Sequence, residues 1–265
     1  MDYISEMFSK DIQEHFFHSV RNQLSEKKHK IALVSTPRVG STMFSNKLSP
    51  IAGKSIYREW LHDKYCIAFQ QLTGKDFDPF VYLEQVLNLF NPKTNTFILN
   101  VHIHQYEYWK TNYQIDVFEY FQFDRVYYIR RDNFFDQVFS FAIAMKSGLW
   151  GSEIEEALKI GKDYKVLVSE EDIVTAITFL KKQQENYKIL VEKHTDYIFS
   201  AERIMENQGT DEVSYLIKDV GIDIPDNIIL KTQRHQPQKQ RSVSCPKNKF
   251  EMKKYFTKYM LQHSA

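Results

Sequence analysis

The sequence is poor in the residues that break or cross-link a fold. Among 265 residues there are 8 glycines, 7 prolines and 2 cysteines. The cysteines, Cys66 and Cys245, are far apart in no metal-type spacing, so neither a disulfide framework nor a cysteine metal site is expected. No Gly- or Pro-rich stretch is long enough to act as a linker. A single domain over residues 1–265 is therefore expected.

Charge excess and long apolar runs are also missing. The 35 Lys and Arg residues nearly balance 34 Asp and Glu, giving a formal net charge of +1. No global field therefore attracts nucleic acid or an anionic membrane. No apolar run approaches ~18 residues, and the N-terminus lacks the pattern of a signal peptide. We expect a cytoplasmic protein that binds neither nucleic acid nor a membrane.

Hydrophobic residues are plentiful, at 43% of the chain, and 15% of all residues are aromatic. Apolar runs indicate strands over 31–35, 96–102, 125–129 and 196–200. Helical spacing and capping residues indicate helices over 5–25, 42–48, 79–90, 106–121, 133–146, 153–160, 170–194, 211–220 and 248–261. Strands that alternate with helices predict an α/β fold with a parallel sheet and right-handed crossovers.

The first candidate site follows the first strand. The apolar run breaks at Thr36-Pro37, turns at Gly40 and enters a helix. Helix N-termini attract anions because their first N–H groups lack partners and the helix dipole is positive there. An arginine in the turn adds a cation with a fork suited to phosphate or sulfate. The expected oxyanion loop comprises Pro37, Arg38, Val39, Gly40, Ser41 and Thr42.

This loop is not an ordinary Walker A motif, which needs a second glycine and a lysine before Ser/Thr. Here no lysine precedes Ser41. The simpler alternative is a plain strand–turn–helix junction in which Ser41 is the N-cap.

A second strand–turn–helix unit spans residues 128–150. Arg130 and Arg131 end the strand, and Ser140 follows nine residues after Arg131. The carboxyl ends of parallel strands are where open α/β sheets bind ligands. The alternative for the arginines is a surface pair bridging to Asp132 or Asp136.

Together the two units resemble those of sulfotransferases that use 3′-phosphoadenosine 5′-phosphosulfate (PAPS), and most of all the bacterial trehalose-sulfotransferase-like group. The resemblance covers residues 30–62 and 125–151. It is carried by Pro37-Arg38, Gly40-Ser41-Thr42, Ala52-Gly53, Glu59-Trp60-Leu61, Arg130-Arg131-Asp132, Gln137-Val138, Ser140, Ala142-Ile143-Ala144, Ser147-Gly148 and Trp150. It implies a P-loop-like three-layer α/β/α fold with a central parallel sheet and helical additions.

The resemblance also implies donor-binding roles. Arg38 would lie beside the transferred sulfuryl group, and Arg131 with Ser140 would hold the 3′-phosphate of PAPS. The family spacing is one residue shorter, which leaves Arg130 and Arg131 as alternatives. Arg234 and Lys239, in a basic Gln-rich stretch, could close over the same phosphate or belong to a solvated surface loop.

Three residues are candidates for the base that takes the acceptor proton. Glu59 matches the glutamate proposed as base in the trehalose-type group, although an effective base there needs a pKa raised by burial. His102 matches the histidine of cytosolic sulfotransferases, with Asn100 in place of their lysine, and histidine has the better ordinary pKa. His104 is expected on the same side of the strand as His102 by alternation.

The expected function is transfer of a sulfuryl group from PAPS, without a metal, to a hydroxyl of a carbohydrate or small metabolite. The alternatives are a P-loop nucleotide kinase or phosphotransferase and a non-catalytic nucleotide-binding module. Trp150 could stack on adenine or pack against the protein. A homodimer is left open.

Overall fold

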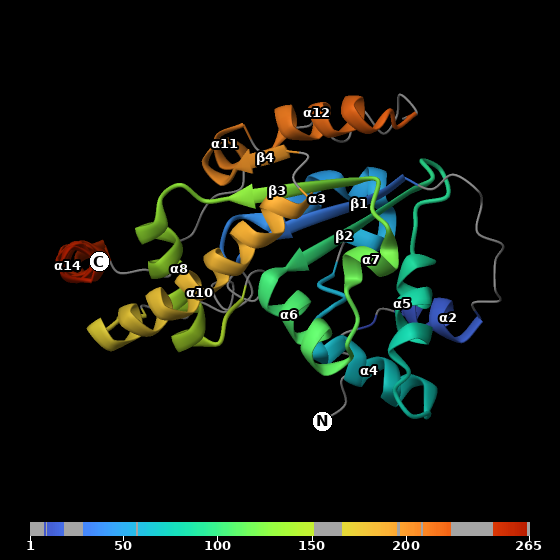
Figure 1. Ribbon diagram of the computed structural model, residues 1–265, viewed down its shortest axis with the longest axis horizontal. Helices are drawn as coiled ribbons and strands as arrows, with labels where there is room; N and C mark the ends of the chain where they lie inside the picture. Colours follow the sequence, from blue (N-terminus) through green and yellow to red (C-terminus); the bar gives the residue numbers. More distant parts are fainter. Residues whose placement is uncertain are drawn as a thin grey trace.

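The centre of the molecule is an all-parallel sheet of four strands (Figure 1). The computed structural model describes residues 8, 10–18, 29–56, 58–150, 166–194, 197–207, 209–223 and 246–263. The strands are β1 (His29–Ser35), β2 (Thr96–His102), β3 (Arg125–Arg130) and β4 (Tyr197–Ser200), in the spatial order β2-β1-β3-β4. The expected α/β class and parallel sheet are confirmed.

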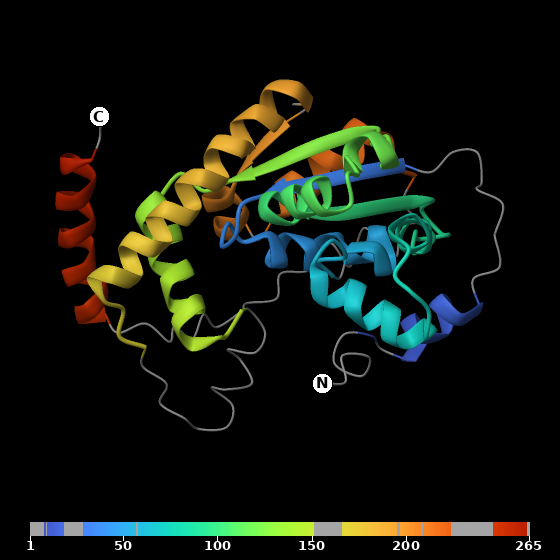
Figure 2. The same cartoon turned by 60° about the horizontal axis from the view of Figure 1, so that its bottom comes forward.

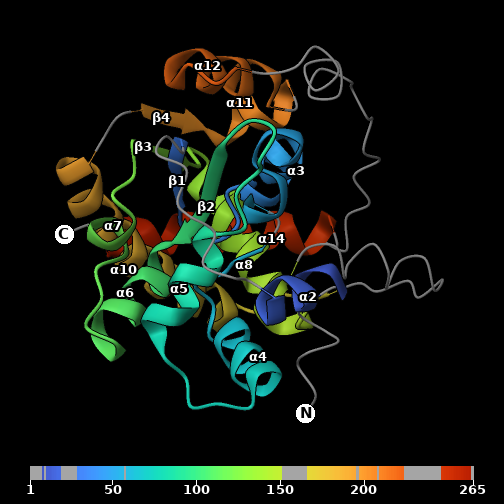
Figure 3. The same cartoon turned by 90° about the vertical axis from the view of Figure 1, so that its right-hand side faces the viewer.

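Helices cover both faces of the sheet, which gives three layers (Figure 3). Alternate residues of β1 point to opposite faces: Ala32 and Val34 belong to one buried cluster, Ile31 and Leu33 to another. The first cluster is completed by α2 (Lys10–His18), α4 (Asp63–Thr73), α5 (Pro79–Leu87), α6 (Ile103–Asn112) and α7 (Val117–Phe121). The second is completed by α3 (Ser41–Ala52), the 3₁₀ helix η1 (Gly53–Ile56), α11 (Ala201–Glu206) and α12 (Thr210–Val220). Buried strand residues on both faces explain why the strands read as continuous apolar runs.

Three further helices extend beyond the carboxyl end of β3, and the C-terminal half of one of them also packs on the sheet (Figure 2). They are α8 (Phe134–Ser147), α10 (Glu170–His194) and α14 (Pro246–Gln262). A third buried cluster joins them, and it includes Val138 of α8 and Ile177 and Leu180 of α10. The helices of the described segments are too short or too polar to cross a bilayer.

The sequence-based helix over 106–121 is wrong, because this segment forms two helices. The side chain of Asp116 accepts hydrogen bonds from the amides of Phe118 and Glu119 and so starts α7 as a separate helix. Gln114, with φ of 55°, breaks the path between α6 and α7. Helices α4 and α11 were not expected, and the helix expected over 153–160 lies outside the described residues. Within the segment expected as a helix over 5–25, α2 is the described part.

Candidate functional site

The loop between β1 and α3 has the backbone of an anion-binding turn. Arg38 and Gly40 both have left-handed backbones, with φ of 66° and 84°. Gly40 is the N-cap of α3 and supplies no side-chain cap, so the first amides of the helix remain available to a ligand. The alternative that Ser41 is the N-cap is wrong, since Ser41 is the first residue inside the helix.

Arg38 connects the two motifs recognised in the sequence. Its Nε donates to Ser140 Oγ on α8 at 3.0 Å. Burial, and then the neighbouring charge of Arg131, lower the pKa of Arg38 from its ordinary value. No carboxylate of a described residue forms an ion pair with this guanidinium. Arg38 therefore carries a partly buried charge that no described acidic group balances.

Arg131, and not Arg130, contacts the anion loop. Its NH1 donates to the carbonyl oxygen of Arg38 at 3.0 Å, and its side chain is 16% exposed. Its Nε is buried without a hydrogen-bond partner among the described residues, although Asp136 and Glu202 lie at 4.0 and 3.9 Å from the guanidinium. Arg130 is 59% exposed and pairs with Asp132 at 2.9 Å. The interpretation as a surface ion pair thus holds for Arg130.

The other loop residues have distinct positions. Val39 is fully buried in the core, so its side chain anchors the loop. Pro37 is also buried, Ser41 is half-buried, and Thr42 is exposed.

Arg234 and Lys239, expected from the sequence to close over the 3′-phosphate, lie outside the described residues.

Gln137 holds the loop against α8, a role that sequence reasoning missed. Its side-chain amide donates to Thr36 Oγ1 and to the carbonyl oxygen of Pro37, both at 2.7 Å. It lies one helical turn before Ser140, on the same side of α8. That spacing is the signal that could have identified it.

Glu59 and His102 form a hydrogen-bonded ion pair. The Nε2 of His102 lies 3.2 Å from Glu59 Oε1, and Gln105 Nε2 donates to Glu59 Oε2 at 2.6 Å. The Nδ1 of His102 lies 3.2 Å from Ser35 Oγ, on the residue with which it pairs in the β1–β2 ladder. Two of the candidate bases, Glu59 and His102, are therefore partners in one group, and this group contacts Ser35, the last residue of β1 before the anion loop.

Mutual attraction sets the ionisation of the pair. Burial alone would raise the pKa of Glu59, but the charge of His102 and hydrogen bonds from His102 and Gln105 lower it to about 2. Burial alone would lower the pKa of His102, but Glu59 raises it above its ordinary value. The condition set from the sequence, a Glu59 pKa raised by burial, is not met. Glu59 is 44% exposed and His102 is 7% exposed, so Glu59 is the member that an acceptor can reach.

His104 lies beside His102, but for another reason than strand alternation. The strand ends at His102, and His104 is in the first turn of α6, with its ring centroid 5.8 Å from that of His102. Burial, and then the charge of His102, lower the pKa of His104 to about 4. Its ring is therefore neutral near pH 7.

Asn100 has a structural role. Its side-chain amide is buried and donates to Ser45 Oγ at 2.9 Å and to the carbonyl oxygen of Ile56 at 3.1 Å. It therefore links β2 to α3 and η1.

Trp150 is half exposed and packs edge-to-face on Phe141, with ring centroids 5.6 Å apart.

We predict that Glu59→Gln lowers the pKa of His102. Without the carboxylate the burial cost prevails, so the imidazole loses its proton at lower pH than in the parent protein. A ring-proton NMR titration of His102 in both proteins measures this. An unchanged or higher pKa in Glu59→Gln would contradict the ion pair.

The same shifts determine how stability depends on pH. Folding raises the pKa of His102, so its contribution is present below about 6.5 and is lost as pH rises through the folded value. Folding lowers the pKa of Glu59, so its contribution is present above about 4.5 and is lost as pH falls toward about 2. The pair therefore stabilises the fold most between about pH 4.5 and pH 6.5.

No group of three or more metal-type ligands occurs among the residues that the structure describes. No protein-family model matches the chain, and no curated protein matches it with significant similarity.

Proposed function

We propose that this protein is a PAPS-dependent sulfotransferase with a P-loop-like three-layer fold. The observation that carries the proposal is the meeting of Arg38, Arg131 and Ser140 at the uncapped N-terminus of α3. The Glu59–His102 pair ends the neighbouring strand. Anion binding and proton transfer are therefore supported at one edge of the sheet, as group transfer from an anionic donor requires.

The donor site fits an anion that carries two separate charged groups. Among the described residues, Arg38 has no carboxylate partner and the Nε of Arg131 has no hydrogen-bond partner, although Glu202 lies 3.9 Å away. Arg38, Gly40, Ser41 and Thr42 would hold the phosphosulfate, while Arg131 and Ser140 would hold the 3′-phosphate. When bound, PAPS supplies the sulfuryl group and leaves as adenosine 3′,5′-bisphosphate.

The residues of the chain have complementary tasks. Glu59 takes the proton that the acceptor hydroxyl loses as its oxygen bonds to sulfur. His102 and Gln105 hold the two oxygens of Glu59 and orient them. Arg38 and the first amides of α3 stabilise the negative charge left on the phosphate oxygen when its bond to sulfur breaks.

A kinase is the weaker alternative. Its P-loop needs a lysine, and Mg²⁺ needs oxygen ligands at a neighbouring strand end. In the described residues, β2 and β3 end instead in His102 and Arg130. A non-catalytic module is also the weaker alternative, because the carboxylate of the Glu59–His102 pair is 44% exposed, where an acceptor can reach it. The acceptor, a carbohydrate or small metabolite, is proposed from the family resemblance alone.

Calorimetry with three nucleotides tests the proposal. We expect adenosine 3′,5′-bisphosphate to bind about tenfold or more tightly than adenosine 5′-monophosphate, because only the former reaches Arg131 and Ser140. Ser140→Ala should reduce that preference. A preference for ATP over the bisphosphate would overturn the sulfotransferase proposal. Transfer from labelled PAPS to a panel of sugars and small alcohols would then identify the acceptor.

A further inference from the structure

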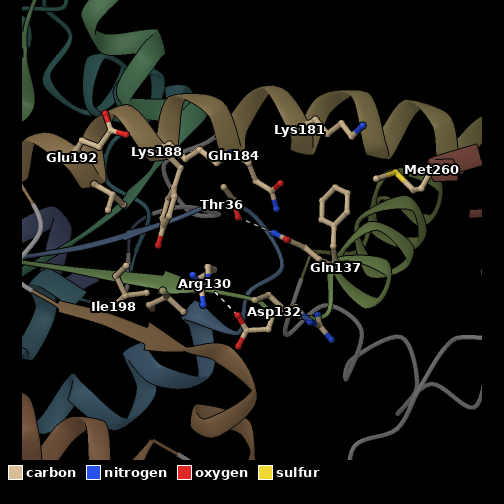
Figure 4. Close-up of a pocket in the computed structure, with 15 residues that line it drawn as sticks. Thr36, Arg130, Asp132, Gln137, Lys181, Gln184, Lys188, Glu192, Ile198 and Met260 are labelled. Atoms are coloured by element: carbon tan, nitrogen blue, oxygen red, sulfur yellow. Dashed lines mark hydrogen bonds and ion pairs between the residues drawn. The ribbon is translucent and has the colours of Figure 1, made fainter. Parts of the chain in front are cut away.

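We propose that a pocket between α10, α8 and the carboxyl end of β3 binds a small organic anion with an apolar body. The pocket has a volume of about 490 Å³ (Figure 4). That volume lies in the ordinary range of small-molecule sites. Arg131 borders both this pocket and the site described above, but Ser140, Glu59 and His102 do not line the pocket, so it adjoins that site without coinciding with it.

One side of α10 forms the polar wall of this pocket. Lys181, Gln184 and Lys188 follow one another at helical spacing and line the pocket together. Figure 4 shows these side chains on the helix above, with Thr36 and Gln137 below them. The wall is thus built from a regular helix face that a ligand would meet as one surface.

The charge of the pocket favours an anion. Its walls contain the cations Arg130, Arg131, Lys181 and Lys188 but only the acids Asp132 and Glu192. Asp132 is already bound by Arg130 at 2.9 Å. Neither Lys181 nor Lys188 has an ion pair with a described residue. Two ammonium groups without an ion pair to a described residue, on one wall, are the basis for a carboxylate or phosphate ligand.

A buried hydroxyl gives independent support. Tyr187 lines the pocket and is 8% exposed, and its OH has no hydrogen-bond partner among the described residues. An unpaired buried hydroxyl is costly, and a ligand oxygen would satisfy it. The remaining walls are apolar, from Ile129, Phe134, Val191, Ile198 and Met260. A ligand with an anionic group and an apolar body fits this pocket, because the anionic group would meet the lysines of α10 and the body would meet the apolar walls.

The pocket also touches the elements that hold the anion loop. Gln137 lines it and donates to Thr36 and Pro37, while Arg131 lines it and donates to the carbonyl oxygen of Arg38. An occupant therefore meets two side chains on which the loop depends. The inference does not rest on the sulfotransferase proposal, because the residues on which it is tested, Lys181, Lys188 and Tyr187, have no part in that proposal and the test needs no donor.

Calorimetry of the full chain with phenyl phosphate tests the inference. We expect the double variant Lys181→Gln/Lys188→Gln to bind about tenfold more weakly, because two charge-assisted contacts are lost. The matched control is Lys182→Gln, an exposed lysine of the same helix that does not line the pocket, which should bind within about twofold of the parent. Phenol, which lacks the phosphate, should bind far more weakly.

Tyr187→Phe adds a test in which stability and ligand affinity are expected to respond differently. Removal of the unpaired hydroxyl should leave the free energy of unfolding unchanged or higher, while phenyl phosphate should bind about threefold or more weakly. Absence of binding by the parent protein overturns the inference. So does binding that Ser140→Ala abolishes but the lysine pair does not affect, since the ligand would then lie at α3.

Discussion

Glu59→Gln is expected to lower kcat of the proposed sulfuryl transfer by about 10³-fold, within the range ascribed to a general base. The amide keeps the size of the side chain but cannot take a proton. Donor binding should change by less than about threefold, because Glu59 contacts neither Arg38 nor Ser140 in the described structure. Rates measured with saturating labelled PAPS, together with calorimetry of adenosine 3′,5′-bisphosphate, separate the two effects.

The pH dependence sharpens this prediction. While His102 is protonated, its charge holds the pKa of Glu59 at about 2 and makes the carboxylate a weak base. As pH rises through the raised pKa of His102, that charge disappears and Glu59 becomes more basic. We therefore expect kcat to rise with pH above about 6.5, the ordinary value for histidine.

Gln105→Leu is the matched positioning variant. It removes the hydrogen bond to Glu59 Oε2 but leaves the carboxylate in place. We expect a smaller loss of kcat, about tenfold, with the pH profile displaced because Gln105 no longer helps to lower the pKa of Glu59. Full transfer activity in both Glu59→Ala and His102→Ala would refute the proposed base.

Arg38→Ala is expected to weaken binding of adenosine 3′,5′-bisphosphate by about 100-fold, the cost of losing a bidentate charged contact in a partly buried site. The free protein should not be destabilised in proportion. Arg38 and Arg131 are near enough that the charge of Arg131 lowers the pKa of Arg38, so removing one cation relieves repulsion. For the same variant, calorimetry should therefore show weaker binding of the bisphosphate, while chemical denaturation should show a free energy of unfolding that is unchanged or higher.

Arg130→Ala and Arg131→Ala form a matched pair for the 3′-phosphate. Arg131 donates to the loop, whereas Arg130 is exposed and bound to Asp132. We expect Arg131→Ala to remove the preference for the bisphosphate over adenosine 5′-monophosphate, and Arg130→Ala to preserve it. The reverse result would assign the 3′-phosphate to Arg130 and displace the proposed site by one residue.

The order of the elements could be predicted because it depends on local patterns. The strand expected over 96–102 and the helix expected over 170–194 coincide with β2 and α10, since apolar runs and helical spacing are properties of short segments. The break between α6 and α7 was missed, because a single capping residue, Asp116, outweighs the apolar pattern there. Gln137 was missed as a loop anchor because its partners are remote in sequence.

The sequence by itself determined which chemical groups lie at the carboxyl ends of the strands. Arg38 in a turn before a helix, two arginines at the carboxyl end of β3 and a histidine at the end of β2 all follow from local order. Only the tertiary structure decided how these groups act on one another. It brought Arg131 rather than Arg130 into contact with the anion loop, joined Arg38 to Ser140, and made Glu59 and His102 one ion pair. The reason is that charge and hydrogen bonding act over a few ångströms, and residues far apart in sequence come that close only in the folded chain.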